Sequence, residues 1–175
     1  MTKLKKNLRA LPLAALCLLV LGGAAALAQR QLKSAVVVGR PEVKVMLSGS
    51  VLRDQEKLPL EKVEKVNPGE ILDWTITSEN NGDGSALSYK TVGQIPKGTT
   101  FVAGSATADG STTVVYSIDN GQTYSVQPMI DEKQSDGSTK KVAAPVSMYT
   151  QVRYEWADPL AADSKLSAAY KVRVK

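Results

Sequence analysis

Hydrophobic and polar residues alternate along most of the chain from Pro41 onward. Apolar side chains recur at every second position, and clusters of Gly, Pro, Asn and Asp interrupt them, which is the pattern of short β-strands joined by turns. The clearest strands cover residues 72–77, 149–156 and 166–174. Seven or eight strands without a convincing amphipathic helix predict an all-β fold, an antiparallel two-sheet sandwich of immunoglobulin-like type.

The alternation also predicts which side chains share a face of a strand. Val43, Val45 and Leu47 point to one side of the first strand, and Trp74 is expected in the core on the central strand. Leu87 and Tyr89, together with Thr91 or Val92, are assigned to the strand that follows.

Turn and loop positions follow from residue type. Asn80–Gly84 is predicted to be a tight reversal, because Asn and Gly tolerate positive φ. Asn120-Gly121 is able to form the type I′ turn of a hairpin. The polar, glycine-containing stretch 131–141 is expected to be a mobile surface loop. Pro59 argues against a continuous helix over 55–66, so this stretch is predicted to be a strand or loop with a charged, solvated face.

The first 28 residues have the order of a secretory signal peptide. A basic start without acidic residues precedes the apolar run 11–21, and Ala26 and Ala28 occupy the small-residue positions that a signal peptidase needs. Cleavage is therefore expected before Gln29, which places the protein in the periplasm, on the cell surface or outside the cell. The alternative is an uncleaved anchor, whose apolar stretch barely reaches the roughly 20 residues that span a bilayer.

Composition changes once this leader is set aside. Cys17 is the only cysteine and lies within the leader, and Leu16 precedes it where a lipid attachment site needs a small residue. No disulfide is then expected in the exported chain. Four of the 22 basic residues also lie in the leader, which leaves 18 against 17 acidic residues. Such a balance does not favour nucleic acid or an anionic membrane as partner.

The 147 residues after the leader have the size of one domain. The predicted organisation is a signal peptide at 1–28, a linker or loosely docked edge strand at 29–40, and a sandwich at 41–175. Within 29–40, the apolar run Ala35–Val38 stands out.

Several turn and strand motifs follow one another in a recognisable order between Val43 and Lys175. They are Pro68-Gly69-Glu70, Trp74, Asn80-Asn81-Gly82, Pro96-Lys97-Gly98-Thr99, Phe101-Val102, Gly104-Ser105 and Val172-Arg173-Val174. In this order the chain resembles the repeat of bacterial surface proteins catalogued as domain of unknown function eleven. The resemblance implies an immunoglobulin-like sandwich with a structural rather than catalytic role. The chain departs from the family pattern in having Gly93-Gln94 where an acidic residue is usual, and in having a single repeat where many members carry several.

Candidate chemistry is sparse. The chain has no histidine, so a Ser-His-Asp triad, a Cys-His dyad and a His-rich zinc site are excluded, and we expect no enzyme. Calcium is the more plausible cofactor, with Asp83, Asp109 and Asp119 as weak loop candidates. None belongs to a twelve-residue calcium loop with a closing Glu, and such residues also simply make turns.

The leading hypothesis is a non-enzymatic, exported structural or interaction protein of the bacterial cell envelope that acts through protein–protein contacts. Val36, Val37 and Val38 would pair with an exposed edge strand of another subunit. One alternative is a glycan-binding module, with Trp156 on an exposed aromatic platform. Another is a calcium-dependent adhesion domain. No stable membrane span is expected after cleavage of the leader.

Overall fold

The computed structural model describes residues 39–54 and 56–175, and Gly39–Lys175 form one compact unit. The predicted signal peptide and almost all of the predicted linker lie outside the described residues, as do Val36, Val37 and Val38. Among the described residues, the structure consists of strands and two short 3-10 helices. In chain order these are β1 Val43–Arg53, β2 Glu56–Pro59, η1 Leu60–Lys62, β3 Ile71–Asn80, β4 Lys90–Gln94, β5 Thr99–Phe101, β6 Thr107–Ala108, β7 Thr112–Ser117, β8 Met129–Lys133, β9 Thr139–Ala143, η2 Val146–Met148, β10 Gln151–Trp156 and β11 Ser164–Val174.

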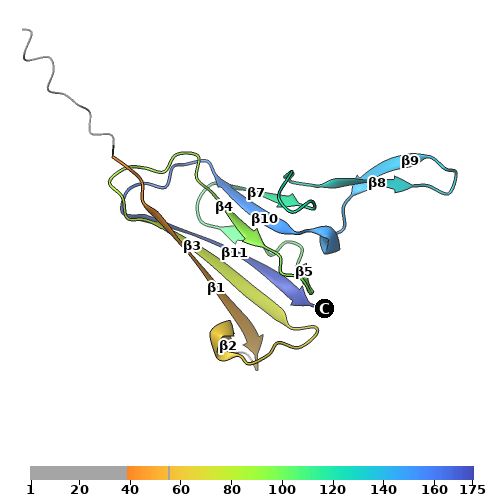
Figure 1. The fold of residues 1–175 in the computed structure, drawn as a ribbon, viewed down its shortest axis with the longest axis horizontal. Coiled ribbons are helices and arrows are strands. Elements are labelled where there is room, and N and C mark those ends of the chain that lie inside the picture. The colour runs from red at the N-terminus through yellow and green to blue at the C-terminus, as the bar shows by residue number, and fades with distance from the viewer. Residues whose placement is uncertain (1–38, 55) are drawn as a thin grey trace, which may run out of the picture. The chain divides into compact units, whose positions relative to one another are not determined.

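The strands form three antiparallel sheets (Figure 1). The largest has the order β2-β1-β3-β11-β5, with β6 also paired to β11. The second has the order β4-β10-β7, and the third is the β8-β9 hairpin alone. The all-β, antiparallel prediction is thus confirmed. The strand number was underestimated, since the short strand β6 and the two strands of the hairpin were not predicted.

The hydrophobic core lies between the two larger sheets. Its buried residues come from both of them: Val51, Leu72, Ile76, Phe101, Val152, Tyr154, Trp156, Ala168, Tyr170 and Val172. The two fully buried tyrosines donate their hydroxyls to backbone carbonyls, Tyr154 to Ala169 at 2.7 Å and Tyr170 to Gln94 at 2.5 Å. These bonds satisfy the polar ends of two large core side chains and tie the sheets together. Burial raises the pKa of Tyr170 to about 12.

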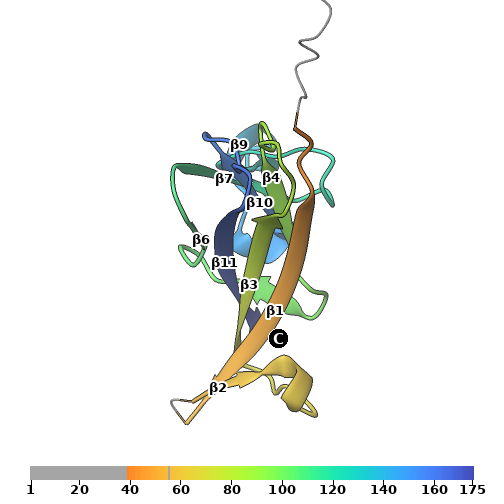
Figure 2. The ribbon, with the colours of Figure 1, turned by 90° about the vertical axis from the view of Figure 1, so that its left-hand side faces the viewer.

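The centre of the large sheet confirms the predicted central strand. β3 pairs with β1 on one side and with β11 on the other, and Figure 2 shows β1 at the margin of this group. Trp74 is partly buried and packs against the core from the same face of β3 as Leu72 and Ile76. Gly49 lies opposite Trp74, and the Trp74 ring and the Leu60 side chain fill the space that a Cβ at Gly49 would need.

Three local predictions are wrong. Residues 131–141 are not a loop, because Ile130 pairs with Val142 and Gly137, at φ 84°, makes the turn of the β8-β9 hairpin. Leu87 does not belong to β4 and is 75% exposed, while Thr91 faces the core instead. Asn80–Gly84 does end β3 as predicted, but none of its residues has a positive φ, so the predicted reason for the break is wrong.

Two other turn predictions have clearer outcomes. Asn120 and Gly121 both have positive φ, at 57° and 90°, as a type I′ turn requires. The returning arm of that predicted hairpin is reduced to one bridge between Tyr116 and Ser125. Pro59 does end an extended segment, since β2 stops there and only the short η1 follows.

Candidate interaction surface

The inner face of β1 is covered along only half of its length. Gly49 and Val51 are buried, whereas Val45 and Leu47, on the same face of the strand, are 53% and 57% exposed. The η1 segment covers the buried half, with Leu60 against Gly49. Among the described residues, Val45 and Leu47 on the other half of this face have no such cover.

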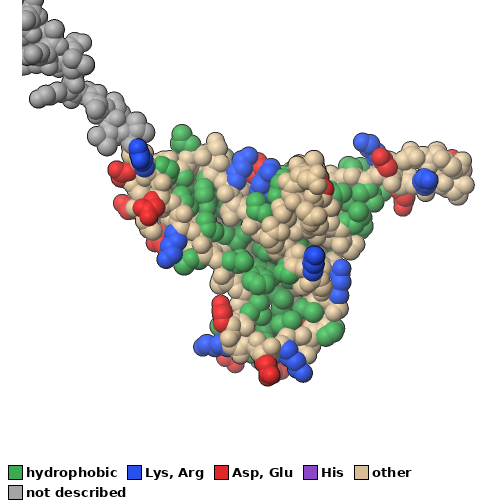
Figure 3. Space-filling view, viewed as in Figure 1, with side chains coloured by type: hydrophobic (Ala, Val, Ile, Leu, Met, Phe, Trp, Pro, Cys, Tyr) green, Lys and Arg blue, Asp and Glu red, His purple; other side chains and the backbone are tan. Residues whose placement is uncertain are grey.

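Half of the inner face of β1 is uncovered because of where the β4-β10-β7 sheet lies. Tyr116 of β7 packs on Phe101 of β5, with ring centroids 5.2 Å apart. The Tyr170 ring of β11 lies so close to Gly93 of β4 that a Cβ there would overlap it. The three-stranded sheet therefore faces β5 and β11 rather than β1. Figure 3 shows hydrophobic side chains at the surface where Figure 1 places β1 and β3.

The same stretch of β1 has a free backbone edge. β2 pairs with β1 only from Ser50 to Arg53, so residues 43–49 have no strand partner on that side among the described residues. Asn81 donates its backbone N–H to the carbonyl of Glu42, which directs Glu42 toward β3. Antiparallel ladders alternate this direction residue by residue, so the N–H and C=O groups of Val43, Val45 and Leu47 face outward.

We call residues 43–49 the open edge. Natural edge strands usually carry several charges, a proline or a bulge that prevents pairing with another chain. The open edge has one charge, Lys44, which lies opposite Glu79 of β3, and the side chain of Met46 is 41% exposed on the outer face. It combines unpaired backbone groups with exposed apolar side chains, which suits the addition of an extended segment.

The start of β1 is fixed against the end of β3. Arg40 donates its backbone N–H to Asp83 Oδ1 at 2.6 Å, and Gly84 donates to the carbonyl of Arg40 at 3.3 Å. Gly82 and Gly84 pack directly on the backbone of residues 39–42, where a Cβ at either position would overlap backbone atoms. These glycines are thus needed for close approach of two chain segments.

Asn80 is the hub of this junction. Its side chain is fully buried, and its Oδ1 accepts hydrogen bonds from the backbone of Glu42 and Gly82, at 3.0 and 3.1 Å. Its Nδ2 donates to the carbonyls of Gly84 and Leu160, at 2.7 and 3.1 Å. One amide group therefore joins β1, the end of β3 and the segment before β11.

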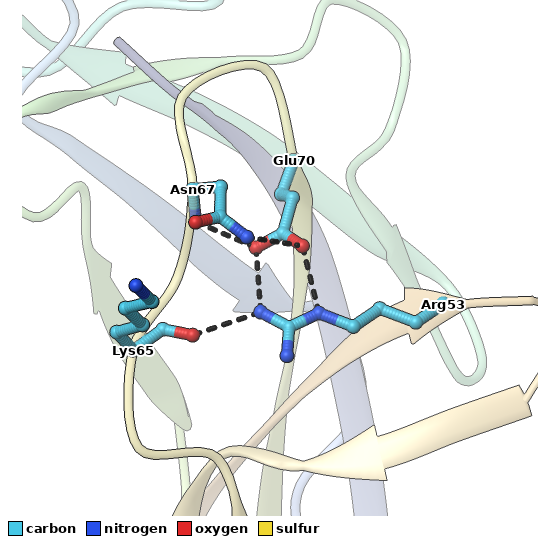
Figure 4. A network of polar contacts seen from close by, with 4 residues as sticks. All are labelled: Arg53, Lys65, Asn67 and Glu70. Atoms are coloured by element: carbon cyan, nitrogen blue, oxygen red, sulfur yellow. Dashed lines mark hydrogen bonds and ion pairs between the residues drawn. The ribbon is translucent and has the colours of Figure 1, made fainter.

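The far end of β1 is fixed by an ion pair (Figure 4). Arg53 donates from Nε and Nη2 to the two carboxylate oxygens of Glu70, at 2.7 and 2.9 Å, and from Nη2 to the carbonyl of Lys65. The backbone N–H of Asn67 also donates to Glu70, at 2.7 Å. The hydrogen bond from Arg53, followed by that from Asn67, lowers the pKa of Glu70 to about 2. Both ends of β1 are therefore held in place.

Trp156 is not part of an exposed platform. It is 6% exposed, packs against Tyr89 and Tyr154, and donates from Nε1 to the carbonyl of Asp109 at 2.9 Å. Its position follows from β10, whose buried face carries Val152, Tyr154 and Trp156. The predicted glycan platform on Trp156 is wrong for this reason.

The three calcium candidates each have their carboxylate engaged by the chain itself. Asp83 accepts from Arg40, and Asp109 Oδ2 accepts from the backbone of Ser167 at 2.8 Å. Asp119 accepts from Thr123 N and Oγ1, at 2.9 and 2.6 Å, and from Ser117 Oγ, and these bonds lower its pKa to about 2. Within the described part of the chain, no three His, Cys, Asp or Glu side chains form a group that could hold a metal ion.

In residues 39–54 and 56–175, no helix is long and apolar enough to cross a membrane. Comparison with protein-family models, curated proteins and solved structures found no match for this chain.

Sequence reasoning placed Val43, Val45 and Leu47 on one face of a strand but did not identify them as surface residues. A usable signal was present in the stretch 43–47, which has one charge and an apolar residue, Met46, on its otherwise polar face.

Proposed function

We propose that this protein is a non-enzymatic interaction protein whose open edge accepts an extended protein segment as an additional strand. The observation that carries the proposal is the coincidence of a free backbone edge with the exposed side chains of Val45 and Leu47. Fully burying such a side chain contributes about 1.5–3 kcal/mol, and the new ladder adds hydrogen bonds and directionality.

The wider setting of the proposal comes from the sequence. The leader supports export to the periplasm, the cell surface or the outside of the cell. The order of turn motifs supports an immunoglobulin-like sandwich related to the domain of unknown function eleven, with a structural role in the bacterial envelope. The core between two antiparallel sheets is compatible with that architecture.

Self-assembly is the form of interaction that we favour. The apolar run containing Val36, Val37 and Val38 is one predicted donor strand, and it lies outside the described residues. Deletion of residues 29–38 tests this donor, because the truncation leaves Gly39 and the contacts around Asp83 in place.

The proposal is tested with Val45→Pro in the chain from Gln29. The Val45 N–H faces away from β3, so proline there removes a donor for an added strand without removing a bond of the β1-β3 ladder. Light scattering coupled to size-exclusion chromatography over a concentration series measures self-association. We expect association at least tenfold weaker than in the parent chain, with an unchanged far-ultraviolet circular dichroism spectrum.

Leu47→Lys is a second variant that keeps the backbone, and we expect it to weaken association in the same way. Leu87→Lys is the matched control, since Leu87 is still more exposed and lies outside β1. If Val45→Pro and Leu47→Lys associate as the parent chain does, or if the parent is a monomer at every concentration, the proposed self-assembly through the open edge is wrong.

A further inference from the structure

The β8-β9 hairpin is the least supported element of the structure. Within residues 39–54 and 56–175, it pairs with no other strand and contributes no side chain to the buried core. Figure 1 shows it projecting from the sandwich on the side away from β1. Two-stranded hairpins are only marginally stable in water. A third strand along one of its edges would stabilise it.

The outer edge of β8 offers its backbone in a defined pattern. Ala144 donates to the carbonyl of Pro128, and Gln134 donates to that of Ser138, both at 2.8 Å. Residues 128 and 134 therefore point toward β9. By the alternation of an antiparallel ladder, Met129, Asp131 and Lys133 point their N–H and C=O groups away from β9.

We propose that the open edge of β1 binds the β8 strand of a second copy of this chain. The inference rests on the proposed function and names its partner. In the antiparallel register that joins the outward backbone groups of both strands, Leu47 lies opposite Met129 of the second copy, Val45 opposite Asp131 and Val43 opposite Lys133.

The charged side chains favour this register. Within one copy Lys44 lies beside Glu79, and in the hairpin Glu132 lies beside Lys140. The register places Lys44 opposite Glu132 of the second copy. Charges then alternate across four adjacent strands, from Glu79 through Lys44 and Glu132 to Lys140, and each neighbour has the opposite sign.

Two groups of apolar side chains fit the same register, whereas Val45 and Val43 lie opposite the charged Asp131 and Lys133. On the inner face, Leu47 pairs with Ile76 in one copy and Met129 pairs with Ala143 in the other. The register places Leu47 next to Met129, so the four apolar side chains form one row across the strands. On the outer face, Met46 meets Ile130 and Val142. A shift by two residues in either direction instead places Lys44 opposite Ile130 or Gln134, and the charge match is lost.

Pro128 is also accommodated. It lies opposite Ser48, at a position where the backbone of β8 faces β9, so the proline nitrogen is not needed for a bond to β1.

The contact joins two different surfaces of the molecule, so each copy carries one open edge and one free β8 edge. Such a contact builds closed rings, of which a reciprocal dimer is the smallest, or open chains.

The test exchanges the central charge pair in the chain from Gln29. We expect Lys44→Glu alone and Glu132→Lys alone each to weaken self-association at least tenfold, measured by light scattering over a concentration series. An equimolar mixture of the two variants should associate more strongly than either alone. The unsubstituted β1 of one variant can pair with the unsubstituted β8 of the other, and the two substituted strands form the reversed pair. Lys97→Glu, in an exposed turn outside both strands, is the control.

The outcomes separate this inference from the proposed function. If neither exchange weakens association, or if mixing restores none of it, β8 is not the partner strand. If Val45→Pro nevertheless abolishes association, the open edge is in use and a different segment occupies it. Loss of association on deletion of residues 29–38, with no recovery in the charge-exchange mixture, would identify the N-terminal run as that segment.

Discussion

Asn80 shows how much of the fold depends on one buried amide. The side-chain amide of Asn80 both accepts and donates hydrogen bonds. The substitution Asn80→Asp keeps the shape of the side chain but removes the N–H donors that bind the carbonyls of Gly84 and Leu160. Burial of the new carboxyl group against carbonyl oxygens lowers the stability of the fold further. We expect the free energy of unfolding to fall by about 3 kcal/mol, measured by urea denaturation. Asn81→Asp, at the exposed neighbouring position, is the matched control.

An Asn80→Asp protein as stable as the control would show that the hydrogen bonds of this amide are dispensable.

The end of β3 at Asn80–Gly84 was predicted from the sequence, but for the wrong reason, a positive φ. Glycines at Gly82 and Gly84 are needed because residues 39–42 pack against them. Which segment packs there depends on the pairing of β1 with β3, and no local pattern encodes that. Trp156 was misplaced for a similar reason, because alternation does not tell which face of a strand another sheet covers.

At the scale of elements, the Arg53–Glu70 pair joins the end of β1 to the turn before β3 and makes stability depend on pH. The Glu70 pKa is about 2 in the folded protein, against an ordinary value of 4.5. Its stabilising contribution is complete above pH 4.5 and is lost as the pH falls from there through 2. We expect Glu70→Gln to lower the urea midpoint at pH 7 and to reduce the further loss between pH 4.5 and 2.

Asp119 also has a lowered pKa, so Glu70→Gln should leave part of the acid destabilisation in place. Glu64→Gln removes an exposed carboxylate outside the network and controls for the loss of one charge. An acid limb in Glu70→Gln as steep as in the parent chain would contradict the assignment.

The elements themselves were largely readable from the sequence. Period-two alternation located β3, β10 and β11, because one face of each meets the core while the other meets solvent. The hairpin of β8 and β9 was missed since most of both its faces is exposed and polar, and polar strands resemble loops. Its two apolar pairs, Met129 with Ala143 and Ile130 with Val142, are adjacent at one end of the hairpin, and this is too short a signal to distinguish a strand from a loop.

At the scale of the whole molecule, the hairpin should be separable from the sandwich. Its ends meet where Ala144 donates to Pro128 at 2.8 Å, so residues 129–143 can be replaced by Gly-Gly. We expect the melting temperature in calorimetry to change by no more than about 4 °C, because the hairpin adds nothing to the buried core. Self-association should be lost at the same time. A large fall in melting temperature would show that the hairpin supports the sandwich.

The unequal width of the two main sheets was beyond prediction. Strand patterns identify which segments pair well, but the placement of β4 and β7 over β11 and β5 depends on contacts such as those of Tyr170 with Gly93 and of Tyr116 with Phe101. The uncovered half of β1 is a consequence of that placement. The candidate surface therefore emerged only when the packing of the sheets was known.

The arrangement of β1, β3 and β11 also determines how the molecule would carry a mechanical load. β1 and β11 both run antiparallel to β3, and Val43 and Ser164 lie at the same end of it, opposite Asn80. The chain thus enters the sheet at one end and leaves it, after Val174, at the other. A pull between these two ends shears both ladders along their length, so that many hydrogen bonds resist together. A pull across the strands at one end of the sheet would instead break the hydrogen bonds one at a time, at far lower force.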